Sequence, residues 1–381
     1  MLPEGWKEVK LEEAVSFLDG KRKPLKSEDR LKIRGQYPYY GATGIIDYVN
    51  DYIFDDTLIL MGEDGENIIS RNLPHVFIIS GKTWVNNHAH VLKAKKYCDT
   101  RFLSSYLESL NYEKYNTGSA QPKLNKAICE NIRILLPPFP EQKKIAAILS
   151  TWDRAIEGTE KLLANSQQQK KALMQQLLTG KKRLPGFTGE WKNYKLYAVG
   201  NITTGNTPST KDESLYGEKF LFITPVDLGN CKYVRKSERM LSEKGASISR
   251  MIPAGSIFFS CIGTIGKMGI ATRDCITNQQ INAIEVKKIH NNEFIYYQIF
   301  SNKEQIDKLT AKQAVPIINK KTFSNFIISS PSLPEQKAIA AVLSTTDEEI
   351  AAIESDLSRL RQEKKALMQQ LLTGKRRVTV D

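Results

Sequence analysis

A glycine-rich stretch at residues 260–271, SCIGTIGKMGIA, has the composition of a loop that could bind phosphate. A phosphate loop needs four residues between its glycines, and a Ser or Thr after the lysine to hold magnesium. Here only two residues separate Gly263 from Gly266, and Met268 follows the lysine. The spacing therefore favours a tight glycine turn between two strands over a nucleotide site.

Two histidines and an acidic loop are the other candidates for catalysis. His88 and His90 stand two apart in residues 84–94, WVNNHAHVLKA, which alternate like a single strand and lack the nearby Cys or carboxylate partners of a zinc site. The carboxylates at 63–66 could bind a nuclease metal, but no lysine follows in the usual strand arrangement. We expect a solvated acidic loop there, or carboxylates that accept from cytosine amino groups. The sequence also lacks a dinucleotide fingerprint and an Asn/Asp-Pro-Pro-aromatic motif, so these residues indicate a binding protein.

The loops carry the side chains that read nucleic acid. Base edges are read by amide, hydroxyl and guanidinium groups, and phosphates are bound by Lys and Arg. The candidate DNA-binding residues of the first half are Lys21, Arg22, Lys23, Asn86, Asn87, His88, Ser119, Gln121 and Lys123. Those of the second half are Thr204, Asn206, Thr207, Lys211, Lys267, Asn278, Gln279, Gln280, Lys312, Gln313 and Lys320. For any one of them, an ordinary solvated loop residue is the alternative.

One long stretch occurs twice in the chain. Residues 140–183 align with residues 334–377 without a gap, at a constant offset of 194 and with 28 of 44 positions identical. This period is far too long for a solenoid, so the chain is an internal duplication. The predicted order is a globular segment at 1–139, a helix at 140–183, a second globular segment at 184–333 and a second helix at 334–381.

Both copies have the heptad pattern of a coiled coil, because their apolar residues recur at alternating steps of four and three. The predicted seam comprises Ile145, Leu149, Trp152, Ile156, Leu163, Leu173 and Leu177 in the first copy, and Ile339, Leu343, Ile350, Ile353, Leu357, Leu360, Leu367 and Leu371 in the second. Polar residues share this seam and could fix its register: Thr159, Ser166, Lys170, Thr346 and Lys364. Neither helix has an apolar partner in its own copy, so we expect the two to pair antiparallel. Two long helices lying separately on globular domains are the alternative.

The two globular segments resemble each other weakly. Asn86, Asn87 and His88 align with residues 278–280, and the stretch at 117–134 aligns with 311–328. Diverged copies of one module should do the same task on different targets. The predicted fold class is α+β, with two mixed α/β domains separated by two long antiparallel helices that form a coiled coil, as an internal pseudo-twofold duplication.

The amino-acid composition predicts a polyanionic binding partner. The net charge is +13, with a pI near 9.3, which favours nucleic acid first and an anionic membrane second. No apolar run approaches the ~18 residues of a membrane span. The five cysteines are scattered and never form a C-x-x-C pair, which indicates a reducing cytoplasm.

The duplicated helices resemble a known family. Pro140-Glu141-Gln142-Lys143 and Pro334-Glu335-Gln336-Lys337 open helices that both contain KKALMQQLLTGK, and a variable module precedes each. This pattern, over essentially the whole chain, is similar to the specificity subunit of type I restriction–modification systems.

The resemblance implies two target-recognition domains that each bind one half of a split sequence in double-stranded DNA. The helices would then be the spacer between half-sites and a platform for two methyltransferase (M) subunits, with the glutamines at 167–169 and 175–176 as docking candidates. It also implies that this chain is not catalytic and binds no cofactor or metal. S-adenosylmethionine for adenine methylation, and ATP and Mg for the restriction/motor (R) subunits, would be bound by partners.

Two other classes of function remain open. One is a coiled-coil scaffold that joins two protein-binding modules, although this would leave the basic, amide-rich loops unexplained. The other is an enzyme that itself methylates or cleaves DNA.

Overall fold

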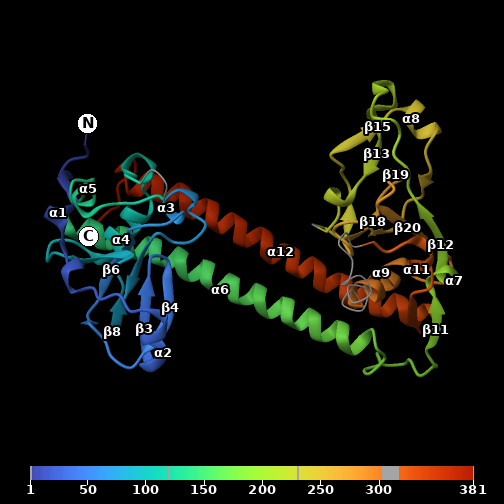
Figure 1. The fold of residues 1–381 in the computed structure, drawn as a ribbon, viewed down its shortest axis with the longest axis horizontal. Coiled ribbons are helices and arrows are strands. Elements are labelled where there is room, and N and C mark those ends of the chain that lie inside the picture. Colours follow the sequence, from blue (N-terminus) through green and yellow to red (C-terminus); the bar gives the residue numbers. More distant parts are fainter. Residues whose placement is uncertain (1, 119–120, 230, 303–316, 381) are drawn as a thin grey trace. The chain divides into compact units, whose positions relative to one another are not determined.

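The structure, a computed structural model, describes residues 2–118, 121–229, 231–302 and 317–380. Its contacts divide the chain into two compact units. Unit 1 is Met1–Lys161 with Ser355–Asp381, and unit 2 is Leu162–Glu354. Each unit therefore combines one globular domain with parts of both long helices, α6 (Phe139–Leu177) and α12 (Leu333–Leu371) (Figure 1).

The domain of unit 1 is built from two small sheets and a short strand pair. One sheet has the order β2 (Val15–Phe17), β9 (Ala89–Ala94), β6 (Leu58–Gly62) and β7 (Val76–Ile79). The other has the order β4 (Gly44–Val49), β3 (Arg34–Gly41), β8 (Lys82–Val85) and β5 (Phe54–Asp55), and β1 (Lys7–Lys10) pairs with β10 (Arg133–Leu136). The helices are α1 (Leu11–Ala14), α2 (Ser27–Lys32), α3 (Asn67–Ser70), α4 (Thr100–Glu108) and α5 (Lys126–Glu130). Every residue of the apolar run Leu58–Gly62 in β6 is buried, so this strand lies inside the domain core.

The domain of unit 2 repeats this topology. One sheet has the order β12 (Gly200–Thr204), β20 (Ile281–Val286), β17 (Ile257–Ser260), β18 (Met268–Ala271) and β14 (Tyr233–Val234). The other has the order β15 (Arg239–Leu241), β13 (Tyr216–Ile223), β19 (Cys275–Thr277) and β16 (Met251–Ile252), and β11 (Lys192–Lys195) pairs with β21 (Ile327–Ser330). The helices are α7 (Leu196–Val199), α8 (Glu243–Ser247), α9 (Asn292–Ser301) and α11 (Lys320–Ser324). The glycine-rich stretch is the predicted turn between β17 and β18, since Gly263 and Gly266 have φ of 74° and 78°.

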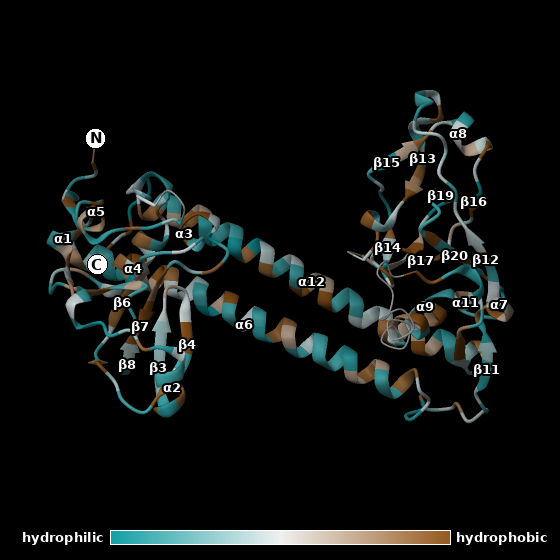
Figure 2. Ribbon diagram, in the orientation of Figure 1, coloured by the Kyte–Doolittle hydropathy of each residue, from teal (hydrophilic) through white to brown (hydrophobic). Residues whose placement is uncertain are grey.

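The predicted seam is the buried stripe of both long helices. Every predicted seam position, including the polar ones, is buried or half-buried, while its neighbours on the outer face are exposed. Figure 2 shows hydrophobic turns recurring along otherwise hydrophilic helices. At their starts the seams enter the domain cores: Ile145 and Leu149 pack in unit 1, and Ile339 and Leu343 in unit 2.

The helices run antiparallel in both units. In unit 2, Lys170 pairs with Asp347, and in unit 1, Lys364 pairs with Asp153. These two ion pairs are the same contact at the duplication offset of 194. The polar seam lysines thus fix the register of the helix pair, as predicted.

The first turn of each long helix holds a buried glutamate that binds an arginine beyond the end of the other helix. The side chain of Glu141, which is 3% exposed, accepts from Arg377 Nε and Nη2 at 2.7 and 2.9 Å. Glu335 is 1% exposed and accepts from Arg183 Nε and Nη2 at 2.6 and 2.7 Å. Such bidentate pairs are strong and directional, so the repeated glutamate locks the helix pair within each unit.

The glutamine that follows ties each long helix to its own domain. Gln142 Oε1 accepts from the backbone N–H of Asp99 at 2.8 Å, and Gln336 Oε1 accepts from that of Asn291 at 2.9 Å. Asp99 and Asn291 cap α4 and α9 with their side chains. The Pro-Glu-Gln motif therefore orients each domain on the helix that follows it.

A glycine in the left-handed conformation follows the end of each long helix. Gly180 and Gly374 have φ of 68° and 73°. A Cβ on Gly374 would lie 2.5 Å from Pro3 Cγ, whereas one on Gly180 would meet the Trp191 ring at 3.4 Å. The second glycine is therefore needed both for its φ and for its lack of a side chain.

We expect Gly374→Ala to destabilise unit 1 by more than Gly180→Ala destabilises unit 2. Left-handed backbone alone costs an alanine about 1–2 kcal/mol, and only Gly374→Ala adds a clash. Urea unfolding of both variants measures this. Gly158→Ala is the control, because it lies in α6 with open space around it and should be neutral or stabilising. Equal losses in the two glycine variants would contradict the assigned contact with Pro3.

One sequence prediction is wrong in the domain of unit 1. Residues 84–94 were expected to form one strand, but they form the end of β8, a turn at 86–88, and β9. Burial does not alternate along this stretch, because Trp84 and Val85 are both buried before the turn and Ala89 is buried after it. Alternation alone could not reveal the break.

Candidate nucleic-acid interface

In each domain, several strand ends and one loop meet at a single edge. In unit 1 these are the end of β3, the β8–β9 turn, the end of β6 and the loop before α5. The backbone joins them: Asn86 N donates to Tyr40 O at 3.1 Å, Glu63 N to His88 O at 2.8 Å, and Leu124 N to Glu63 O at 2.8 Å. Candidate residues from three separate parts of the sequence are therefore neighbours here.

Arg22 and the acidic loop form an ion-pair network at this edge. Arg22 Nη1 donates to Glu63 Oε2 at 2.6 Å and to Ala89 O at 2.8 Å. Lys123 Nζ lies 3.5 Å from Glu63 Oε1, and His88 Nδ1 lies 2.8 Å from Asp64 Oδ2. The expectation of a solvated acidic loop is wrong, because Glu63 and Asp64 are paired with candidate residues and only partly exposed. The guanidinium of Arg22 thus stabilises the β8–β9 turn through these internal contacts.

Beneath this network lies a buried histidine with two acceptors. His90 Nδ1 is 2.7 Å from Asp19 Oδ2, and His90 Nε2 is 2.9 Å from Leu124 O. Since a carboxylate and a carbonyl can only accept, both ring nitrogens must donate, which requires the protonated ring. Burial opposes the charge, but the hydrogen bond to Asp19, the contact with Cys129 and the charge of Asp19 together outweigh it and raise the pKa of His90 to about 10.

The pH dependence of unit 1 stability should report this pair. A histidine whose pKa is raised by folding contributes its full stabilisation at pH values below its pKa in the unfolded chain, which is about 6.5. This contribution is lost as the pH rises from there through the pKa in the folded chain, about 10. We therefore expect the unfolding free energy to fall between pH 6.5 and 10 in the native chain. Urea titrations at several pH values measure it, and in His90→Gln the slope over this window should be reduced. An unchanged slope in the variant would contradict the charged ring.

The domain of unit 2 builds the same edge with the same backbone contacts. Asn278 N donates to Ile223 O at 3.1 Å, Cys261 N to Gln280 O at 2.8 Å, and Ile318 N to Cys261 O at 2.9 Å. The strand pairs correspond as well, since β3–β8 and β13–β19 are both parallel. The weak alignment of residues 86–88 with 278–280 is therefore a structural equivalence.

The side chains at the second edge differ from those at the first. Thr204 Oγ1 donates to Asn282 Oδ1 at 2.7 Å, and Thr207 Oγ1 bonds to Gln279 Oε1. Arg250, which sequence reasoning missed, donates to Thr204 O at 2.6 Å and orders this loop. By the same backbone contacts, Cys261 lies at the position that Glu63 has in unit 1, and the polar side chains that bond to each other at this second edge carry amides and hydroxyls.

A cavity of about 450 Å³ opens at this second edge. Asn278 and Gln280 line it, together with Thr224, Thr264, Glu238 and Arg239, which the sequence did not single out. These polar groups could bind the edge of a base.

The remaining candidates are placed as follows. Lys21, Lys23, Asn87, Gln121, Lys211 and Lys320 are exposed, Asn206 is half-buried, and Lys267 is half-buried with Nζ donating to Pro225 O at 3.1 Å. Ser119, Lys312 and Gln313 lie outside the described residues. The exposed lysines are available for phosphates, whereas Arg22 and Lys267 have internal partners.

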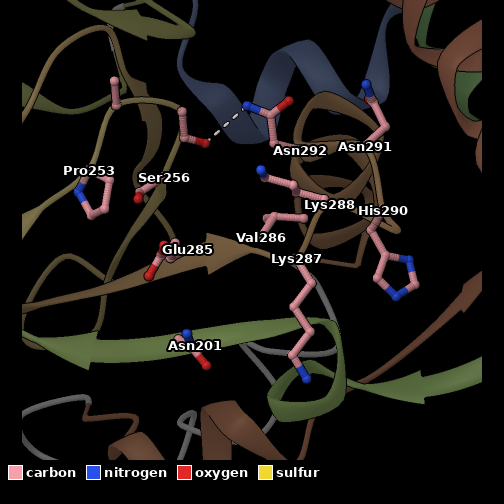
Figure 3. Close-up of a pocket in the computed structure, with 12 residues that line it drawn as sticks. Asn201, Pro253, Ser256, Glu285, Val286, Lys287, Lys288, His290, Asn291 and Asn292 are labelled. Carbon is pink, nitrogen blue, oxygen red and sulfur yellow. Dashed lines mark hydrogen bonds between the residues drawn. The ribbon is translucent and has the colours of Figure 1, made fainter.

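A second cavity in unit 2, of about 410 Å³, lies at the start of α9 (Figure 3). Asn292 Nδ2 donates across it to Gly255 O at 2.9 Å, and Glu285 faces it together with Lys287 and Lys288. Of the candidate residues that the structure describes, none lines this cavity. Its mixed charges give no reason to place a nucleic acid there.

Comparison with known proteins identifies the family. Residues 3–165 and 188–361 match the type I restriction modification DNA specificity domain. The chain belongs to this family. The MjaVIII type I specificity subunit of Methanocaldococcus jannaschii is 26% identical over 412 residues, covering 99% of this chain and 94% of that relative. A putative specificity subunit of Haemophilus influenzae, S.HindORF215P, is 38% identical over 141 residues, which are 36% of this chain and 35% of that relative.

Solved structures share the fold. The S subunit of a type I restriction–modification system from M. genitalium has a TM-score of 0.69 at 15% identity, covering 96% of both chains. A chain from a study of type I complex assembly has a TM-score of 0.58 at 18% identity, covering 99% of this chain and all of that one. The predicted fold of two mixed α/β domains with duplicated long helices is confirmed. Among the described residues, no helix is long and apolar enough to span a membrane.

Proposed function

We propose that this chain is the DNA-binding specificity subunit of a type I restriction–modification complex. The domains at 1–139 and 184–333 each bind one half of a split target, and the long helices set the unread gap between the halves. The chain itself is not catalytic. S-adenosylmethionine, ATP and Mg are bound by methyltransferase and restriction/motor subunits, and the complex works in the cytoplasm.

The observation that carries this proposal is that both domains have the same backbone arrangement at one edge but different side chains there. A carboxylate, imidazole and lysine edge in unit 1 and an amide and hydroxyl edge in unit 2 offer different hydrogen-bond patterns to a base pair. The net charge of +13 supplies attraction to phosphates. Family membership favours this function over a protein scaffold or a self-sufficient enzyme.

Exchange of the first domain tests the proposal. Residues 1–139 are replaced by the corresponding domain of another family member, and methylation is mapped in cells that carry the complete system. We expect one half of the target to change and the other to remain. A change in both halves would contradict independent domains. Binding to duplex DNA that does not weaken with salt would favour the scaffold, and methyl transfer by the purified chain alone would favour the enzyme.

The outer faces of the long helices are the proposed methyltransferase platform. All five glutamines at 167–169 and 175–176 are exposed, and Gln167 and Gln175 line a groove of about 1130 Å³ with Met174 and Phe300. An amide-rich rim around an apolar floor suits a protein partner.

We expect Gln175→Arg with Gln176→Arg to remove one of two methyltransferase subunits. The duplication supplies a matched variant, because Gln369 and Gln370 are the equivalent exposed residues of α12. Native mass spectrometry of the reconstituted complex counts the bound subunits. Loss of one subunit in each double variant, and of both in the fourfold variant, supports docking at these faces; full occupancy in the fourfold variant contradicts it.

A further inference from the structure

The β8–β9 and β19–β20 turns share one construction. Asn86 Oδ1 accepts from the backbone N–H of His88 at 2.8 Å, and Asn278 Oδ1 accepts from that of Gln280 at 3.1 Å. Both asparagines are buried, with 4% and 8% of their surface exposed. Their side chains thus hold the turn from inside and have little surface left for DNA.

The backbone of the third residue of each turn is fixed at both its N–H and its carbonyl. His88 O accepts from Glu63 N, and Gln280 O accepts from Cys261 N, each at 2.8 Å. The asparagine fixes the N–H of this residue and the neighbouring strand end fixes its carbonyl. Its side chain can therefore vary while its position stays the same.

In unit 1 this side chain is an imidazole oriented by a carboxylate. His88 Nδ1 lies 2.9 and 2.8 Å from the two carboxylate oxygens of Asp64, and the side chain is 51% exposed. Asp64 draws the proton to Nδ1, so in the neutral ring Nε2 is an acceptor. An acceptor suits the exocyclic amino group of cytosine or adenine.

In unit 2 the same position carries an oriented amide. Gln280 Oε1 accepts from Asn278 Nδ2 at 2.9 Å, which fixes the orientation of the amide and leaves two Nε2 donors and one oxygen lone pair. Gln280 also lines the 450 Å³ cavity at this edge. A glutamine amide pairs with adenine through its N7 acceptor and N6 donor.

We propose that His88 and Gln280 are the specificity-determining residues of these two equivalent turns, with Asn86 and Asn278 as positioning residues. Each turn reads one base pair in its own half of the target: Gln280 an adenine, and His88 a base with an exocyclic amino group. This proposal rests on the proposed function, because it assigns the residues through which each domain discriminates.

Reciprocal substitutions test the proposal in the complete system. Methylation mapping of His88→Gln should show changed or relaxed preference at one position of the half-site bound by the first domain, with the other half intact. Gln280→His should change or relax the preference at one position of the half-site bound by the second domain, with the first half intact. Lys21→Ala is the control, since Lys21 is exposed and removing a phosphate contact weakens binding to all sequences alike.

The asparagines are tested by rescue. Asn86→Ala should relax preference at the same position as His88→Gln, and Asn86→Asp, which keeps the acceptor oxygen, should retain it. If His88→Gln and Gln280→His both gave methylation maps identical to that of the native chain, the proposal would be overturned and the proposed function would be left intact. A native chain without any sequence preference would instead overturn the proposed function.

A base analogue tests the assignment of Gln280 in the native complex. In the native complex, replacing one adenine of the second half-site by 7-deazaadenine removes the N7 acceptor. We expect roughly tenfold weaker binding at one adenine position, and no further loss from that analogue in Gln280→Ala. If no adenine of the half-site shows this dependence, the assignment of Gln280 is wrong.

Discussion

Insertion of one heptad into each long helix is expected to lengthen the unread gap in the DNA target while both half-sites stay the same. The ion-pair register between Lys170 and Asp347 places Glu354 opposite Leu163. Seven residues are therefore added after Leu163 and seven after Ile353. At 1.5 Å per residue the helix pair grows by about 10 Å, which equals about three base pairs at 3.4 Å each.

The size of this effect has a physical limit. Three base pairs also turn the second half-site by about 100° around the duplex, given 10.5 base pairs per turn. A seven-residue insertion keeps the seam aligned and adds little rotation. We therefore expect a gap longer by one to about three base pairs, together with weaker binding.

Methylation mapping of the complete system measures the gap. The control is the same insertion in α6 alone, which shifts Lys170 out of register with Asp347 and should destabilise the pair. A stable double-insertion variant whose target gap is unchanged would remove the long helices from any role in spacing.

The seam was predictable because a long repeat averages out local exceptions. Thr159 and Ser166 would not suggest a core position alone, yet both are half-buried at the expected places. The duplication supplied a second test of the same pattern. Lys170 and Lys364 occupy equivalent seam positions and pair with equivalent aspartates.

Equivalence between the domains was predictable where a side chain has a local structural task. Asn125 and Asn319 align in the sequence, and both cap short helices by accepting from Ile128 N and Thr322 N at 2.9 and 2.8 Å. Asn131 likewise corresponds to Asn325, since each donates to the carbonyl four residues earlier. These contacts span three or four residues, so the sequence records them directly.

The candidate interface was less predictable because its contacts are distant in sequence. Arg22 and Glu63 are separated by 41 residues, and His90 and Asp19 by 71. Such ion pairs leave no local pattern, so Glu63 resembled a solvated acid and Arg22 a free cation. Burial of Asn86 was equally hidden, since an amide next to a strand suits both a turn and a contact with DNA.

Truncation of the first seam leucines should have the largest effect on stability, and in only one unit each. Leu149 and Leu343 are equivalent under the duplication, and both are fully buried. Leu149 packs in the core of unit 1 and Leu343 in that of unit 2. We expect Leu149→Ala and Leu343→Ala each to cost about 2–5 kcal/mol, from lost burial and the cavity left behind. Leu162→Ala, at a 53% exposed position of α6, is the control and should change stability by at most about 0.5 kcal/mol.

Native-state hydrogen exchange shows where the stability is lost. Leu149→Ala should accelerate exchange in β6 and β9, and Leu343→Ala in β17 and β20, because each leucine supports only the core that contains those strands. Acceleration of all four strands by either variant would show that the units unfold together. Selective acceleration would show that each domain is stabilised by its own end of the helix pair. One recognition domain could then diverge, or be exchanged, without unfolding the other.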